Sequence, residues 1–175
     1  MTASLVQTSA PMDDRAAALV ELARLIEGIP VAMVTTITDD DQFGSRPMLL
    51  ERLESDGSLT FLTHLSSQKV HEVTRDPRVG VAFVSGTGDR YVSVSGTAIV
   101  THDPARMHAL WKATYRAWFP GGPDDPDSAI FTVRIERIEY WDVPTSRLVR
   151  VWCAVKALAT GQVVEAGDHQ TRDLR

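Results

Sequence analysis

The sequence contains a single cysteine, Cys153, so it can form no disulfide within the chain and no zinc site made of four cysteines. No apolar run approaches the roughly 20 residues that a membrane-spanning helix needs, and no basic segment followed by an apolar core marks a signal peptide. Positive charge is also scarce, because 18 Lys and Arg face 23 Asp and Glu and leave a net charge of −5. These absences favour a cytoplasmic protein that binds neither nucleic acid nor membrane.

The remaining composition is typical of one globular domain. The chain has 175 residues, of which 43% are hydrophobic and 23% are charged, so it is long enough to bury a core. Residues 1–12 lack hydrophobic periodicity and are expected to form a flexible N-terminus. Residues 13–160 are expected to form the domain, and residues 161–175 a polar C-terminal tail.

The hydrophobic pattern predicts a mainly β structure with flanking helices. Apolar or alternating segments are separated by turn residues such as Ser55-Asp56-Gly57-Ser58, which is typical of antiparallel hairpins. Six or seven strands around one core are expected to close into a barrel, because closure removes exposed edges. The expected strands are residues 31–38, 46–53, 59–63, 78–84, 90–101 (with a bulge at Gly96), 130–143 and 148–155, and the expected helices are residues 13–27, 67–75 and 103–118.

One segment places a lysine beside several hydroxyl donors. Ser66, Ser67, Gln68 and Lys69 open the short second helix, with Ser66 as the expected N-cap. A phosphate is bound by the backbone N–H groups of a helix N-terminus, by hydroxyl groups and by cations. If the neighbouring strands pair, Arg46 can reach the same anion with its planar guanidinium. Serine at a helix start is more often only a cap, so the spacing alone leaves both interpretations open.

Several stretches resemble a known superfamily. SRPMLL (residues 45–50) and LTHLSSQK (residues 62–69) resemble the flavin mononucleotide (FMN) signature of the pyridoxamine 5'-phosphate oxidase-like superfamily. RYVSVSGTA (residues 90–98) is similar to its next core strand, and Tyr140-Trp141 with Arg147-Leu148 to its C-terminal strand pair. WFPGGPDDP (residues 118–126) resembles the general stress protein branch. The resemblance covers roughly residues 15–160.

This resemblance implies an FMN-binding split β-barrel, six- or seven-stranded and antiparallel. It also implies a homodimer with flavin at the subunit interface. Arg46 and Lys69 would hold the flavin phosphate, with Ser67 and Gln68 beside them. The residues along the ring and the ribityl chain would be Met48, Leu49, Leu62 and Thr63. Trp141 would approach the ring from the other subunit. Flavin adenine dinucleotide (FAD) and a deazaflavin are alternative cofactors.

The sequence departs from the vitamin oxidase in the substrate half of the site. Glu51 stands where the oxidase has a lysine that contacts the substrate phosphate, and a carboxylate repels that phosphate. Val149 replaces a histidine of the oxidase pocket, whereas Arg147 is kept. Trp118 and Phe119 are expected to wall the substrate cleft. We therefore expect no efficient oxidation of pyridoxamine phosphate.

Different functional classes remain open at this point. One is a flavin-dependent oxidoreductase that exchanges electrons with an unidentified small molecule, with chemistry supplied by the cofactor and no catalytic residue identified. Another is a flavin-binding general stress protein without turnover. Haem binding fits least, because no histidine has a clear place in the cleft, and a plain interaction barrel remains if the Arg46 and Lys69 cluster is only a cap. No metal site is expected, because His64, His71, His102 and His108 lack ligand spacing.

Overall fold

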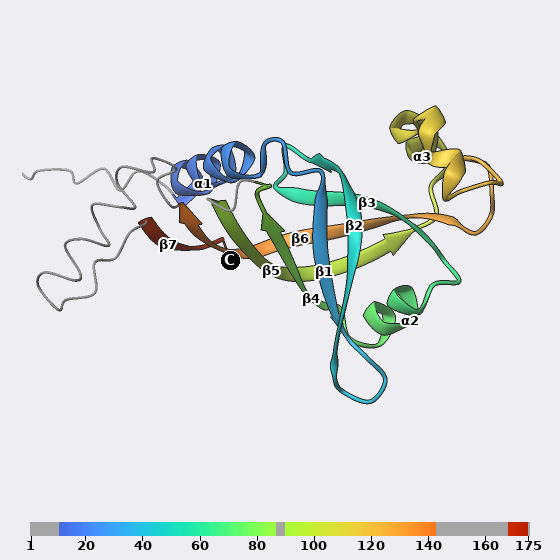
Figure 1. Cartoon of the computed structure of the whole chain (residues 1–175), viewed down its shortest axis with the longest axis horizontal. Coiled ribbons are helices and arrows are strands. Elements are labelled where there is room, and N and C mark those ends of the chain that lie inside the picture. The colour runs from blue at the N-terminus through green and yellow to red at the C-terminus, as the bar shows by residue number, and fades with distance from the viewer. Residues whose placement is uncertain (1–10, 87–89, 143–167, 175) are drawn as a thin grey trace, which may run out of the picture.

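The structure, a computed structural model, describes residues 11–86, 90–142 and 168–174 (Figure 1). Within these ranges the chain forms seven strands, three α-helices and one 3-10 helix. In chain order they are α1 (Pro11–Ile26), β1 (Val31–Ile37), β2 (Phe43–Leu53), β3 (Ser58–His64), α2 (Gln68–Arg75), β4 (Arg78–Val84), β5 (Arg90–Thr101), α3 (Pro104–Leu110), the 3-10 helix η1 (Ala113–Ala117), β6 (Ser128–Asp142) and β7 (Asp168–Asp173).

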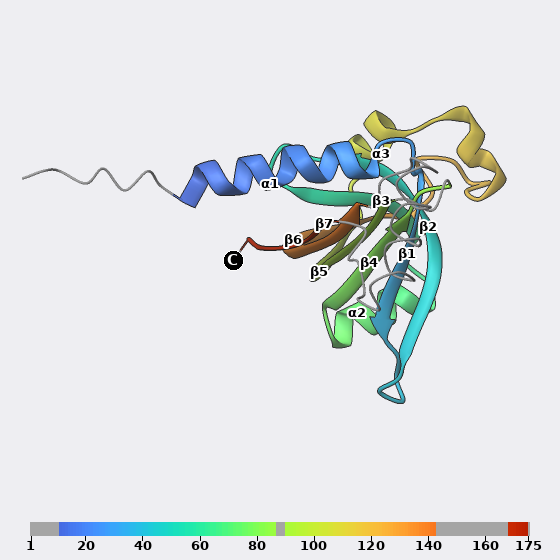
Figure 2. The same ribbon diagram turned by 60° about the vertical axis from the view of Figure 1, so that its left-hand side comes forward.

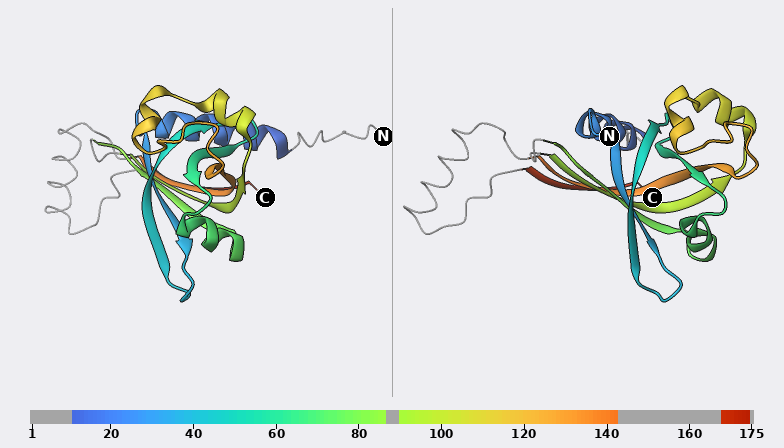
Figure 3. Two further views of the ribbon diagram at one scale, coloured as in Figure 1. Left: turned by 90° about the vertical axis from the view of Figure 1, so that its right-hand side faces the viewer. Right: turned by 45° about the vertical axis from the view of Figure 1, so that its right-hand side comes forward.

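The strands form one antiparallel sheet that closes on itself. The order is β3-β2-β1-β4-β5-β6-β7, and the additional pairing of β6 with β3 closes a barrel of six strands. On the edge of β6 that is not paired with β5, residues 128–134 pair with β3 and residues 137–142 pair with β7. The expected antiparallel split barrel is thereby confirmed. We call residues 90–95 of β5, residues 137–142 of β6 and β7 the arm, which extends away from the barrel (Figure 3).

The core fills the inside of the barrel and continues under α1. Ala32, Val34 and Thr36 of β1 are fully buried, while the alternate side chains of the strand point outward, as a half-buried strand requires. Leu22 and Leu25 of α1 are also fully buried and pack into the same hydrophobic cluster. α1 and α3 lie at opposite ends of the molecule (Figure 1), and the N-terminal half of α1 extends past the barrel (Figure 2).

Two bulges interrupt the strand ladders. In β2 the register with β3 shifts between Leu50 and Arg52, so Glu51 is the extra residue. In β6 the register with β5 shifts opposite Ser95 and Gly96, and the extra residue is Glu136, so the bulge expected at Gly96 lies instead in the strand that faces this glycine. A Cβ atom on Gly96 would lie 2.0 Å from the carbonyl oxygen of Arg134, so the two backbones can approach this closely only at glycine. Bulges re-aim neighbouring side chains and are common beside functional sites.

The structure differs from the expected helices at three places. α1 begins at Pro11, within the stretch expected to be flexible. The expected helix over residues 103–118 ends at Leu110, because Trp111 and Lys112 have extended backbone angles, and a 3-10 helix follows. The N-cap of α2 is Ser67, whereas Ser66 instead donates its hydroxyl to Asp127 at 2.8 Å.

The C-terminal part of the chain also differs from expectation. Residues 168–173, assigned to a polar tail, form β7 and pair with β6. The six-residue sequence is DHQTRD, and such a polar edge strand carries no hydrophobic alternation that would reveal it. The expected strand over residues 148–155 lies outside the described residues.

Candidate functional site

Arg46 on β2 is bound to a buried carboxylate on α2. One terminal nitrogen of its guanidinium donates to the hydroxyl of Thr36, and the other donates to Glu72 Oε2 at 2.8 Å. Glu72 is only 1% exposed, and the Thr36 hydroxyl donates to the same carboxylate oxygen. The pair fixes the direction of the guanidinium and leaves its remaining N–H groups available for another acceptor.

Lys69 adds a second cation in the first turn of α2. Its ammonium makes no hydrogen bond or ion pair with any described residue. Burial lowers the pKa of Lys69 below its ordinary value of 10.5, the charge of Arg46 lowers it further, and Glu72 acts in the opposite direction. The group thus has two positive charges against one negative charge. An anion bound between Arg46 and Lys69 would relieve this imbalance.

A cavity of about 420 Å³ begins at these cations and lies within the size range of small-molecule sites. Its floor and walls come from β1, β2, β3, α2 and the segment around η1. Its lining is mainly apolar, with polar groups at a few places. The lining residues are Val31, Arg46, Pro47, Met48, Leu49, Glu51, Leu62, Thr63, His64, Lys69, Tyr115, Trp118 and Phe119.

The structure brings most of the predicted site residues together at this cavity. Those that line it are Arg46, Met48, Leu49, Leu62, Thr63 and Lys69 from the predicted cofactor site, and Glu51, Trp118 and Phe119 from the predicted substrate cleft.

Three predicted residues of the described ranges do not line this cavity. The Ser67 hydroxyl donates to the carbonyl of His64 at 2.7 Å, and the Gln68 amide donates to Asp39 at 3.1 Å, in the turn between β1 and β2. Trp141 lies on the arm, where it pairs with Tyr91, and is not a lining residue. Arg147 lies outside the described residues.

His64 lines the cavity, although its isolated position in the sequence gave it no role. Its Nε2 is 3.0 Å from the carbonyl oxygen of Trp118, and its Nδ1 is 3.2 Å from Asp127 Oδ2. Its ring is stacked on Phe119 with centroids 4.5 Å apart. Only the fold brings these residues together, since Asp127 is far away in the sequence. Glu72 follows Lys69 by three residues on one helix, a spacing that indicates a pair with Lys69 and not the observed pair with Arg46.

A second polar cluster surrounds Glu51. The hydroxyl of Tyr115 and the ammonium of Lys112, the latter at 3.0 Å, both donate to Glu51 Oε2. The Glu51 side chain is 2% exposed. Burial and the bond to Glu51 raise the pKa of Tyr115, and contacts with Tyr115 and Glu51 raise that of Lys112. These contacts attach η1 to the barrel, and they explain why residues 111–117 do not continue α3.

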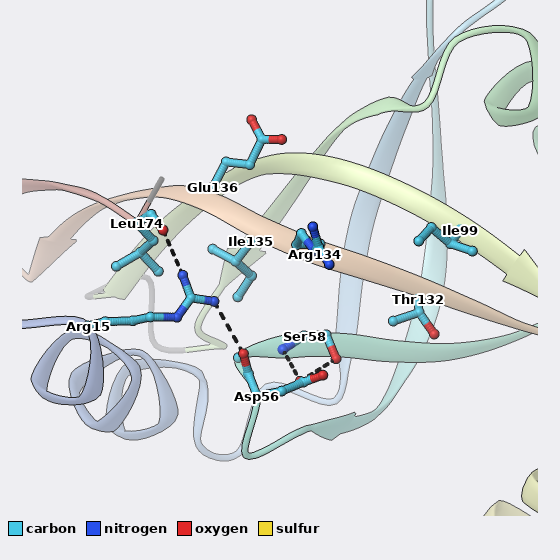
Figure 4. A pocket seen from close by; sticks show the side chains of 10 residues that line it. Arg15, Asp56, Ser58, Ile99, Thr132, Arg134, Ile135, Glu136 and Leu174 are labelled. Atoms are coloured by element: carbon cyan, nitrogen blue, oxygen red, sulfur yellow. Dashed lines mark hydrogen bonds between the residues drawn. The ribbon is translucent and has the colours of Figure 1, made fainter. Parts of the chain in front are cut away.

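A larger cavity of about 560 Å³ lies on another side, between α1, β6 and the turn before β3 (Figure 4). Two of its charged groups, Arg15 and Asp56, already hold parts of the fold together. Arg15 donates to the carbonyl oxygens of Leu174 at 2.7 Å and Asp56 at 3.2 Å, and the Asp56 carboxylate accepts from Ser58. None of the predicted site residues lines it. We therefore assign the candidate site to the smaller cavity.

No helix within residues 11–86, 90–142 and 168–174 has the length and the apolar character needed to cross a membrane. No three His, Cys, Asp or Glu side chains of these ranges gather where they could bind a metal ion.

The fold and the cavity together define a class of proteins, the closed antiparallel barrels that have two cationic side chains at one end of a mainly apolar cavity. The family model described as "Pyridoxamine 5'-phosphate oxidase like" matches residues 17–165, and the chain belongs to this family. The protein bli-3 of Neurospora crassa is 28% identical over 147 residues, which cover 77% of this chain and 68% of that protein. The pyridoxine/pyridoxamine 5'-phosphate oxidase of Escherichia coli O1:K1 is 39% identical over 70 residues, which are 39% of this chain and only 32% of the oxidase.

Solved structures of general stress proteins share the fold. A protein from Clostridium acetobutylicum related to general stress protein 26 has a TM-score of 0.67 at 19% identity, with 91% of this chain and 96% of that chain covered. The general stress FMN/FAD binding protein from Xanthomonas citri has a TM-score of 0.60 at 26% identity, with 70% and 86% covered. The chain is therefore similar in fold to members of the general stress protein branch that its sequence resembles.

Proposed function

We propose that this protein binds a flavin nucleotide in the cavity between β1, β2, β3 and η1. The observation that carries the proposal is the half-buried Lys69 ammonium beside Arg46, which has no acceptor among the described residues. The flavin phosphate would accept from Lys69 and from the remaining N–H groups of Arg46. Met48, Leu49 and Leu62 would supply the apolar wall beside the ring. Family membership and the FMN/FAD binding relative support the same conclusion.

We further propose an oxidoreductase that acts on a small molecule other than pyridoxamine phosphate. A bound flavin supplies redox chemistry, so the polypeptide has to orient the reactants and exclude water. Trp118 and Phe119 wall the cavity, and Trp118 is 64% exposed and therefore accessible to a second ligand. A flavin-binding protein without turnover is the second candidate. It is favoured because Glu51, His64 and Tyr115 are all hydrogen-bonded to the protein itself.

The functional unit that we propose is a homodimer. Val31 pairs with Leu49, and Met33 pairs with both Pro47 and Ala82, so these side chains form one outward-facing apolar patch. Met33 is 43% exposed. Val31, Leu49 and Pro47 also line the cavity. A second copy that covers the patch would therefore also close the open side of the cavity.

A visible spectrum of the purified protein tests flavin binding directly. We expect the yellow absorption of an oxidised flavin, and chromatography of the released cofactor will distinguish FMN, FAD and a deazaflavin. Lys69→Ala should weaken binding roughly 10- to 150-fold, since a hydrogen bond to a charged group is worth about 1.5–3 kcal/mol. Arg75→Ala is the matched control, because it removes one positive charge from the other end of α2. A colourless protein that ignores added flavin, or equal affinity in Lys69→Ala, would refute the proposal.

Turnover and assembly need separate measurements. Anaerobic bleaching of the bound flavin by a nicotinamide nucleotide, followed by reoxidation with an added acceptor, would support the oxidoreductase over the simple binder. Free flavin at the same concentration is the control.

Light scattering should give the mass of a dimer, and Met33→Glu should give a monomer, because it places a charge in the apolar patch. A wild-type monomer would contradict the proposed assembly.

A further inference from the structure

The bulge in β2 directs a carboxylate into the cavity at a distance from the cation pair. Glu51 follows Arg46 by five residues on β2, which is roughly 15 Å along an extended strand. Its side chain is 2% exposed, and it lines the cavity. The cavity therefore has a positive end at Arg46 and Lys69 and an acceptor at Glu51, with the apolar Met48 and Leu49 between them.

One oxygen of this carboxylate is engaged and the other is available. Both donors from the protein, the Tyr115 hydroxyl and the Lys112 ammonium, bind Oε2. Oε1 accepts no hydrogen bond from the described part of the chain. An ionised carboxylate only accepts hydrogen bonds, so a ligand near Oε1 has to supply the donor.

The surroundings of Glu51 also favour a cation over an anion. Lys112 does not line the cavity, and its side chain is 60% exposed, so it pairs with Glu51 from outside the cavity. Tyr115, Trp118 and Phe119 bring three aromatic rings to the same part of the cavity. Aromatic faces attract cations, and flat aromatic ligands pack well against them.

We propose that Glu51 determines the specificity of the second ligand in this cavity, and that it selects an aromatic compound with a protonated nitrogen over one with a carboxylate or a phosphate. This inference rests on the proposed flavin site, because it assigns the ligand that would lie beside the flavin. The protonated nitrogen donates to Glu51 Oε1, and the aromatic ring lies against Trp118 and Phe119.

Three probes of nearly equal shape test this selection. Benzamidine carries one positive charge, benzamide is neutral, and benzoate carries one negative charge. The full-length protein is first loaded with FMN, and its flavin content is measured. Each probe is then titrated while the flavin spectrum and the tryptophan fluorescence are recorded, since Trp118 lines the cavity. We expect benzamidine to bind most tightly and benzoate most weakly.

Two variants separate this role from a purely structural one. Glu51→Gln keeps an acceptor for the Tyr115 hydroxyl but removes the charge, so benzamidine affinity should fall roughly 10-fold or more while benzamide affinity changes little. Lys112→Ala removes a competing cation, so benzamidine affinity should rise. If Glu51 only anchors η1, neither substitution will change the ratio of benzamidine to benzamide affinity.

The outcomes for the two proposals can be told apart. Preference for benzoate, unchanged benzamidine affinity in Glu51→Gln, or no binding of any probe would overturn the role of Glu51, even in a fully flavin-loaded protein. Failure to load flavin would instead contradict the proposed function. In that case the tryptophan fluorescence still ranks the three probes and decides the role of Glu51.

Discussion

Replacing Arg46 by alanine should destabilise the fold, and not only weaken flavin binding. Arg46 neutralises Glu72 at 2.8 Å, and Glu72 is 1% exposed. Removing one partner of a buried ion pair leaves an uncompensated charge and costs about 3–5 kcal/mol. In a chain of this length each 1 kcal/mol lowers the melting temperature by about 2–4 °C, so we expect a decrease of about 6–20 °C.

Thermal unfolding followed by circular dichroism will measure this decrease. Glu72→Gln in the Arg46→Ala background should restore most of the stability, because glutamine is neutral and still accepts a hydrogen bond from Thr36. Arg78→Ala is the control, because the side chain of Arg78 pairs only with Asp76 in the described ranges, at an exposed site, and such surface pairs contribute little to stability.

Either of two results would refute this reasoning. One is an Arg46→Ala protein that melts within about 2 °C of the wild type, and the other is a double variant as unstable as the single one. Loss of flavin from Arg46→Ala could result from weaker binding or from a destabilised fold. Lys69 makes no hydrogen bond or ion pair with the described residues, so Lys69→Ala is the better variant for locating the flavin phosphate.

Two further predictions concern pH and packing. A bound phosphate favours the charged form of Lys69, so flavin affinity should fall as the pH rises through the lowered pKa of this lysine, beginning below 10.5. Flavin fluorescence titrations should show this decrease in the wild type and not in Lys69→Ala. Gly96→Ala should cost about 3 kcal/mol or more, since its Cβ would lie 2.0 Å from the Arg134 carbonyl. Urea unfolding with an unchanged midpoint would contradict that contact.

The barrel could be predicted largely from the sequence because its signals are local. Alternating apolar residues gave β1 to β6 within a few residues, and turn residues indicated the hairpin between β2 and β3. The closing pair of β3 and β6 joins segments about 70 residues apart, and no local pattern specifies it. β7 was missed because its stability comes from pairing with β6 and not from an apolar face.

Site residues could be predicted where a short motif contains them. They could not be predicted where their role depends on contact with a residue that is distant in the sequence. Arg46 and Lys69 were identified from short motifs, and both line the cavity. The carboxylate that neutralises Arg46 was not identified, because only the packing of α2 against β1 brings Glu72 to Arg46 on the neighbouring strand β2. In the same way, the contact of Tyr115 with Glu51 requires η1 to fold back over β2.

The double pairing of β6 has a mechanical consequence. The same continuous strand runs from the arm into the barrel, where Ala129 and Ile130 pair with Thr63 and Leu62 of the cavity wall. A molecule that binds the arm would therefore contact the same strand that supports the cavity wall. A displacement of the arm would be transmitted to Leu62 and Thr63 through this strand, without an intervening loop.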